Sequence, residues 1–234
     1  MTKPVAVIVG VGDGEPASLA RRLAPPPDLV RAAPTGAKMA AVAGETGART
    51  VIMDASDPAA MAALFDDLPA APRVAIYNPS ARQRGPLVEL DPETVRKAVE
   101  VTAFGAFLMG QAAARAMLGA DPVDGTRGTI LFTGASAGVK GFAQSAPFAM
   151  GKFAQRGLAQ SMARELHPQG IHVAWINIDG GIRNPGRPER VDAAGHPDSM
   201  LDPDAIADTY LYLMSQHRSA WSEEVAVRPW VERF

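Results

Sequence analysis

The chain has 234 residues and a formal net charge of −2, and 47% of its residues are hydrophobic and 21% charged. These values are ordinary for a globular protein and exclude a disordered or fibrous chain. Charges of both signs are mixed along the sequence, so that no basic block favours nucleic acid and no acidic tail is present. The chain contains no cysteine, which excludes disulfides, thiolate zinc sites and cysteine nucleophiles.

No stretch approaches about 20 apolar residues, the length that spans a bilayer. We therefore expect a cytoplasmic protein that does not enter a membrane. The four histidines do not have the spacing of metal ligands, so no metal site is expected. Without an internal repeat or a linker-like tract, residues 1–234 are predicted to form one domain.

In the first half of the chain, short apolar runs alternate with helical patterns, as in consecutive βαβ units. The predicted strands are Val5–Gly10, Leu29–Ala33, Thr50–Asp54 and Arg73–Asn78. The predicted helices are Ala17–Leu23 and Asp57–Leu68.

The second half continues this alternation with longer helices. One helix begins at Asp91, where Asp-Pro-Glu supplies an N-cap, a proline and an acid for the first turn, and ends near Leu118. The elements predicted after it are strand Thr129–Thr133, helix Gln144–His167, strand Ile171–Ile178, a loop over Gly180–Pro203, a helix from Asp202 to about Gln216 and strand Glu224–Arg228. This order predicts an α/β fold with a doubly wound parallel sheet of about seven strands and helices on both faces.

Five motifs in register along this pattern resemble the short-chain dehydrogenase/reductase superfamily. A glycine-rich turn with Gly10, Gly12 and Gly14 follows the first strand, Asp54 ends the third strand, and Asn78 ends the fourth. Lys152 lies in the helix after the fifth strand, and Asp179-Gly180 follows the sixth. The resemblance covers nearly the whole chain. It implies an NAD- or NADP-dependent oxidoreductase with a Rossmann-type fold, and cofactor contacts by Gly10, Gly12, Gly14, Asp54, Asn78 and Lys152.

The same alignment shows that the family's catalytic residues are largely replaced. Four residues before Lys152, where the family has the tyrosine that transfers a proton, this chain has Phe148. Phenylalanine has no ionisable group and cannot act as a general acid or base. The family's serine falls on Ala135, next to Ser136, and its asparagine falls on Thr102. The candidate catalytic residues are therefore Lys152, Ser136, Phe148 and Thr102.

The turn that would hold the cofactor phosphates also departs from the family. The third glycine position is Pro16, which removes one N–H donor, and Asp13 and Glu15 bring two carboxylates to the same place. Pro34 stands where a side chain would contact the adenosine ribose. From these residues we expect dinucleotide binding to be weak. The two acids have a second interpretation, as acids that stabilise a helix N-terminus.

Three functions remain open at this stage. The first is an NAD(P)-dependent oxidoreductase with a substitute proton donor such as Ser136, Lys152 or water. The second is a non-redox enzyme in which Lys152, with its pKa lowered by an apolar pocket, is a base or an imine-forming amine. The third is a non-catalytic homologue that binds a partner. The substrate is an unidentified small molecule, since residues 180–203 contain no recognisable motif. The apolar faces of the two long helices predict a homodimer or homotetramer.

Overall fold

Seven parallel strands form one sheet, as the sequence predicted, and their order is β3-β2-β1-β4-β5-β6-β7. The strands are β1 (Val5–Val9), β2 (Asp28–Ala33), β3 (Arg49–Ile52), β4 (Pro72–Tyr77), β5 (Gly128–Thr133), β6 (Ile171–Ile178) and β7 (Glu224–Val227). The structure is a computed structural model that describes residues 4–10, 14–23, 28–35, 37–184 and 186–232, with the backbone alone for residues 37–41. The strand order reverses between β1 and β4, and ligands of such sheets bind beyond the carboxyl ends of the strands at that point.

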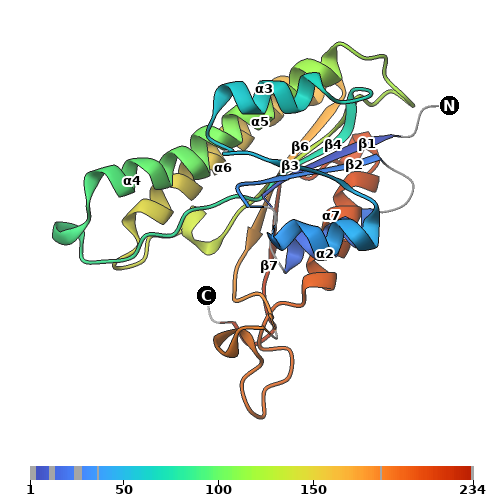
Figure 1. Cartoon of the computed structure of the whole chain (residues 1–234). Helices are drawn as coiled ribbons and strands as arrows, with labels where there is room; N and C mark the ends of the chain where they lie inside the picture. Colours follow the sequence, from blue (N-terminus) through green and yellow to red (C-terminus); the bar gives the residue numbers. More distant parts are fainter. Residues whose placement is uncertain (1–3, 11–13, 24–27, 36, 185, 233–234) are drawn as a thin grey trace.

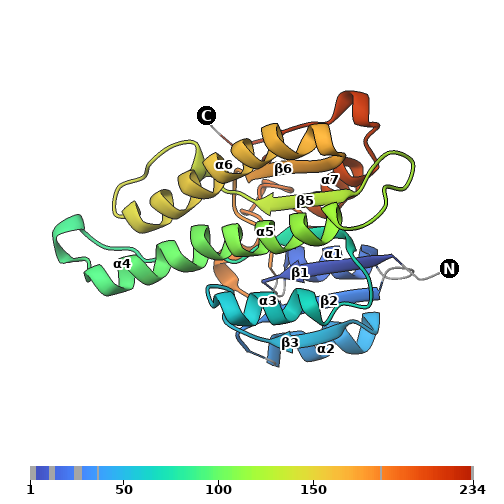
Figure 2. The ribbon, with the colours of Figure 1, turned by 90° about the horizontal axis from the view of Figure 1, so that it is seen from above.

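Helices cover both faces of the sheet (Figures 1 and 2). One face carries α3 (Pro58–Asp66), α5 (Gly105–Leu118) and α6 (Ala146–Leu166), and α4 (Pro92–Val99) precedes α5 and packs against α6. The other face carries α1 (Glu15–Leu23), α2 (Ala37–Thr46) and α7 (Pro203–Ser215). The start of α4 and the first half of α6 project beyond the carboxyl ends of the strands (Figure 2), so that they form one wall above the sheet edge.

The central strands are apolar because both of their faces are covered. All five residues of β1 and all eight of β6 are buried, as expected for parallel strands between two helical layers. The sequence placed every strand to within about two residues. It did not predict α2, whose alanines have high helix propensity but which follows directly on the turn-forming residues Pro34, Thr35 and Gly36.

The expectation that no stretch is long and apolar enough to span a bilayer is wrong for one helix. The segment α4, the π-helical turn η2 (Glu100–Phe104) and α5 forms a continuous helix, Pro92–Leu118, that passes this test by length and composition. Its buried side chains, among them Met109 and Met117, belong to the core between α3, α6 and the sheet. The α5 part of this helix therefore packs in the layer that covers one sheet face.

Helix α6 approaches η2 closely at Gly151. A Cβ atom on Gly151 would lie 2.7 Å from the Cβ of Thr102, so only glycine allows the two helices to pack at this distance. The same helix contains Gly157, where a Cβ would meet no atom within 4 Å. The two glycines therefore differ in their surroundings although they share one helix.

We predict opposite effects on stability for Gly151→Ala and Gly157→Ala. Overpacking at Gly151 should lower the free energy of unfolding by about 1–3 kcal/mol. Alanine at the open Gly157 position should raise it by about 0.5–1 kcal/mol, because alanine has the higher helix propensity. Urea unfolding of both variants and the wild type measures this, and a Gly151→Ala variant as stable as the wild type would contradict the packing.

Candidate active site

Three adjoining cavities follow the carboxyl edge of the sheet. The inner cavity, of about 270 Å³, lies between Gly14, Asn78, Phe148 and Lys152. The outer cavity, of about 520 Å³, has walls from Arg82, Ser136, Phe142 and Phe148 among others. The rear cavity, of about 660 Å³, extends past Asn78 to Pro34 and Asp54. Residues shared between neighbours join the three into one cleft.

Lys152 is the reactive group of the inner cavity. Its side chain is only 2% exposed, and its Nζ donates hydrogen bonds to the Thr133 carbonyl oxygen at 2.5 Å and to Gln155 Oε1 at 3.3 Å. Burial lowers the pKa of Lys152 to about 7, and the positive charge of Arg82 lowers it further, against the opposite effect of Glu15. A large fraction of this amine is therefore uncharged at neutral pH. Lys152 is therefore a buried residue of the cavity and not a surface lysine.

Glu15 is the second ionisable group of the inner cavity. Its side chain is 1% exposed, and Oε1 has no hydrogen-bond partner among the described residues. Burial raises the pKa of Glu15 to about 8, although the charge of Lys152 and a hydrogen bond with Tyr210 lower it. The carboxyl is therefore mostly neutral at pH 7. This corrects two expectations from the sequence, a charged Glu15 that repels a phosphate and a solvated acid at a helix N-terminus.

Two of the other candidate catalytic residues, Ser136 and Thr102, do not line the inner cavity. Ser136 contributes to the outer cavity and not to the inner one. Thr102 is fully buried behind the cleft, where its Oγ1 accepts a hydrogen bond from the Ala81 N–H at 3.1 Å. Only Phe148 shares the inner cavity with Lys152. Thr102 thus anchors the segment after β4, and within the described ranges no hydrogen bond joins Ser136 to Lys152, whose Nζ donates to the Thr133 carbonyl oxygen and to Gln155.

The predicted cofactor residues do lie along the cleft, with the exception of Gly12, which is outside the described residues together with Asp13. Gly10 and Asp54 line the rear cavity, Gly14 lines the inner one, and Asn78 lines both. Gly10 has φ +86°, and a Cβ there would lie 2.6 Å from the ring of Pro79, so this position requires glycine.

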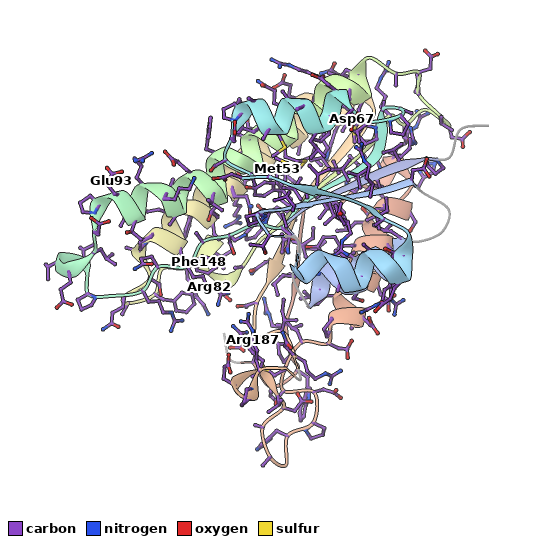
Figure 3. All side chains as sticks on the ribbon, in the orientation of Figure 1. Met53, Asp67, Arg82, Glu93, Phe148 and Arg187 are labelled. Carbon is purple, nitrogen blue, oxygen red and sulfur yellow. The ribbon has the colours of Figure 1, made fainter. Side chains whose placement is uncertain are left out.

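Arginines are the functional feature that the sequence reading missed. Arg183, Arg187 and Arg190, from the segment after β6, line the inner cavity together with Arg82 from the segment after β4. The guanidinium carbon of Arg82 lies 4.6 Å from the centre of the Phe148 ring, and Figure 3 shows these two side chains next to one another. The pattern Arg82-Gln-Arg84 was the available signal, but the charges had been treated as evenly mixed.

Comparison with known proteins gives consistent matches. A family model described as short chain dehydrogenase matches residues 4–185. L-2,3-butanediol dehydrogenase of Corynebacterium glutamicum is 33% identical over 120 residues, which are 51% of this chain and 44% of that protein. The matched part is thus less than half of that relative's length.

Two solved structures resemble the whole chain. A short-chain dehydrogenase from Rhodopseudomonas palustris is 31% identical with a TM-score of 0.80, over 98% of this chain and 100% of that one. A metagenomic short-chain oxidoreductase in complex with NADP is 27% identical with a TM-score of 0.80, over 97% of each chain. NAD or NADP is accordingly the cofactor that such relatives imply for this cleft.

Among the described residues, three features of this cleft disfavour tight binding of a dinucleotide. At the start of α1, the N–H groups of Ala17 and Ser18 already donate to the Gly14 carbonyl oxygen, and Pro16 has no N–H. In the rear cavity, Pro34 offers no polar side chain for a ribose. The Asp54 carboxylate is bound by Lys97 Nζ at 2.8 Å and by Ser56, which lower its pKa to about 2.

We predict that NADH and NADPH each bind with a dissociation constant above about 100 μM, because Pro16 removes one N–H donor from the helix start that usually binds the phosphates and Pro34 offers no polar group to the ribose. Calorimetric titration with either dinucleotide measures this. Low-micromolar affinity would mean that the backbone and the arginines compensate for the lost donors.

We also predict that Glu15→Gln changes how stability depends on pH. The folded-state pKa of Glu15 is raised from 4.5 to about 8, so its contribution is complete below pH 4.5 and is lost as pH rises through 8. The melting temperature of Glu15→Gln should therefore exceed that of the wild type by on the order of 5 °C at pH 8 and by little at pH 5. The exposed Glu165→Gln serves as control; a difference between Glu15→Gln and wild type that is the same at both pH values would show that Glu15 ionises freely.

Proposed function

Because the chain belongs to the short-chain dehydrogenase family but has Phe148 in place of the family's phenol, we propose that it is an enzyme acting on a small carbonyl compound without hydride transfer. In this proposal the Lys152 amine is the nucleophile and the Glu15 carboxyl is the proton donor. Both groups face the inner cavity, and each changes the other's pKa through its charge.

The observation that carries the proposal is the buried amine of Lys152. An amine must be uncharged to attack a carbonyl carbon, and a pKa of about 7 provides this at neutral pH. Imine formation also needs an acid that remains protonated at the same pH. The raised pKa of Glu15 meets that requirement.

The proposed reaction is balanced without an oxidant or a reductant. The nitrogen of Lys152 forms a bond to the carbonyl carbon, and protons from that nitrogen and from Glu15 convert the carbonyl oxygen to water, which leaves. The products of this step are a protonated imine and the Glu15 carboxylate. The imine withdraws electrons from the adjacent carbon, so that the carboxylate accepts a proton from that carbon.

The surroundings of Lys152 support this role. The Thr133 carbonyl and Gln155 hold the amine at the end of β5, and the Phe148 ring excludes water on one side. Gln155 Nε2 also donates to the Thr102 carbonyl oxygen at 3.4 Å, which links the amine to η2. A group fixed by several contacts loses little freedom when it reacts.

A second candidate function is NAD(P)-linked oxidoreduction with a substitute proton donor. Family membership favours it, as does the continuity of the rear and inner cavities, which share Asn78, Ser80 and Arg187. The poor fit to a dinucleotide places it second. A non-catalytic homologue is the third possibility, and an unreactive Lys152 would favour it.

We further propose a cytoplasmic homodimer or homotetramer assembled through α4, α5 and α6. Four large apolar side chains of η2, α5 and α6 are at least 40% exposed: Phe104, Phe107, Met150 and Phe153. A surface of this kind on long helices favours pairing with a second copy. The chain has no cysteine, in keeping with a reducing compartment.

Light scattering tests the assembly. We expect a mass of two or four chains at micromolar protein, because the exposed rings are removed from water when the helices pair. The variant Phe107→Asp should dissociate the assembly, whereas Val88→Asp, at an exposed position outside these helices, should not. A monomeric wild type at micromolar concentration would contradict the proposal.

Borohydride trapping tests the reactive lysine. Incubation with pyruvate, acetone or benzaldehyde followed by sodium borohydride should add the reduced carbonyl compound to Lys152, since borohydride converts an imine to a stable secondary amine. Peptide mass spectrometry locates the adduct. Lys152→Met should abolish the labelling, and Lys140→Met, at an exposed lysine, should leave it unchanged; no adduct on Lys152 with any of these compounds would contradict the proposed function.

Carbonyl reduction is the matching negative control. The wild type should oxidise NADPH negligibly with the same compounds, because positioned general acid catalysis is worth about 10²–10⁴-fold and Phe148 supplies none. Phe148→Tyr alone should recover little, since Thr102 and Ala135 leave the phenol without its usual partners. Strong wild-type turnover with NADPH that persists in Lys152→Ala would instead favour oxidoreduction.

A further inference from the structure

Three arginines line the outer cavity, and no carboxylate does so among the described residues. Arg82 and Arg84 come from the segment after β4, and Arg190 comes from the segment after β6. Two hydroxyl groups, those of Ser136 and Ser145, share the cavity with them. The outer cavity thus combines positive charge with hydrogen-bond donors.

These three arginines are among the nine described arginines for which no salt bridge is found, and they are grouped in one cavity. Eight arginines form salt bridges with aspartate or glutamate: Arg21, Arg22, Arg49, Arg96, Arg156, Arg164, Arg183 and Arg228. Within the described part of the chain, no carboxylate oxygen lies within 4 Å of a side-chain nitrogen of Arg82, Arg84 or Arg190. Burial lowers the pKa of Arg82, and the charges of Arg190 and Arg84 lower it further, so the three cations repel one another.

The fold holds this unfavourable arrangement in place. Two backbone hydrogen bonds fix the segment after β4, from Ala81 N–H to Thr102 Oγ1 at 3.1 Å and from Gly85 N–H to the Gln144 carbonyl oxygen at 3.2 Å. Between them, the Arg82 guanidinium stacks on the Phe148 ring. Cation–π contacts of this kind orient a guanidinium while its N–H groups remain available. A cluster of like charges that is held together without a counter-ion is typical of a site for an anion.

We propose that the outer cavity binds the carboxylate or phosphate group of the small-molecule substrate, with Arg82, Arg84 and Arg190 as its donors. The inference rests on the proposed function, since Lys152 lies in the inner cavity, which shares Arg82, Ala135, Phe148 and Arg190 with the outer one. The substrate is then an anionic carbonyl compound. Its charged group is bound in the outer cavity, and its carbonyl group lies in the inner cavity next to Lys152.

The apolar residues that line the outer cavity indicate the character of the uncharged part of this substrate. Phe142, Phe148 and Ile178 contribute apolar surface between the arginines. An apolar body next to the anion is therefore expected, as in an aromatic or branched keto acid. The outer cavity lies away from the expected dinucleotide path, because Gly14, Asn78 and Asp54 contribute to the other two cavities and not to this one.

Calorimetric titration at low salt tests the anion site with phenylacetate, phenyl phosphate and the neutral phenylacetamide. Phenylacetate and phenyl phosphate carry the two anionic groups on the same ring, and phenylacetamide removes the charge with little change in shape. We expect at least one anion to bind and the amide to bind at least about tenfold more weakly, because a hydrogen bond to a charged group is worth about 1.5–3 kcal/mol. The anion that binds more tightly identifies the site as one for carboxylate or for phosphate.

Two variants distinguish anion binding in the outer cavity from a general effect of positive charge on the protein surface. Arg190→Gln should weaken anion binding about tenfold or more, whereas Arg115→Gln, at an exposed arginine of α5, should not change it. Equal binding of amide and anions, no binding of either anion, or equal effects of the two substitutions would overturn the inference. Melting temperatures of both variants show that they fold.

The anion site and the proposed reaction can be contradicted independently of one another. Lys152→Met should retain anion binding while it loses borohydride trapping. Anion binding by a wild type that forms no adduct would contradict the proposed reaction and support the anion site. Trapping on Lys152 without any preference for anionic ligands would contradict the anion site and support the reaction.

Discussion

The burial of Lys152 is the constraint on which the site depends. A lysine ammonium group removed from water loses solvation that only nearby acceptors or a lost proton can replace. Here the acceptors are the carbonyl oxygen of Thr133 and the side-chain oxygen of Gln155. The close approach of α6 to η2 at Gly151 keeps the amine within the core layer. The chemistry proposed for the inner cavity follows from an amine that is held in this way and is partly uncharged.

The same burial explains how Glu15 and Phe148 fit beside the lysine. A carboxyl group in the first turn of α1 is compatible with a buried place because desolvation keeps it protonated. Phe148 fills the position of a phenol with an apolar ring, and this ring also supports the guanidinium of Arg82. The net charge of −2 gives no indication of the basic outer cavity, which three arginines and no carboxylate line among the described residues.

The sequence predicted the fold well because a parallel sheet that helices cover on both faces produces a simple pattern, in which short apolar strands alternate with helices. Strands such as β6 are buried at every position and mostly apolar, and Asp91 and Asp202 mark helix starts by capping N–H groups. The sequence also identified Phe148 and Lys152 as one-turn neighbours on α6. It did not indicate that Thr102 faces a backbone N–H or that Ser136 lies in a different cavity, because both depend on the path of the segments after β4 and β5. The arginine cluster was missed for the same reason: residues about 100 positions apart meet only when the sheet is formed.

The most direct test of this account is the pKa of the Lys152 amine, measured by NMR of protein that carries ¹³C at the lysine ε carbon. The chain has five lysines, and the Lys152→Met variant assigns the signal. The account predicts a titration near 7 for this signal. A midpoint near the ordinary value of about 10.5 would show that Lys152 stays charged at neutral pH, and would contradict its role as a nucleophile.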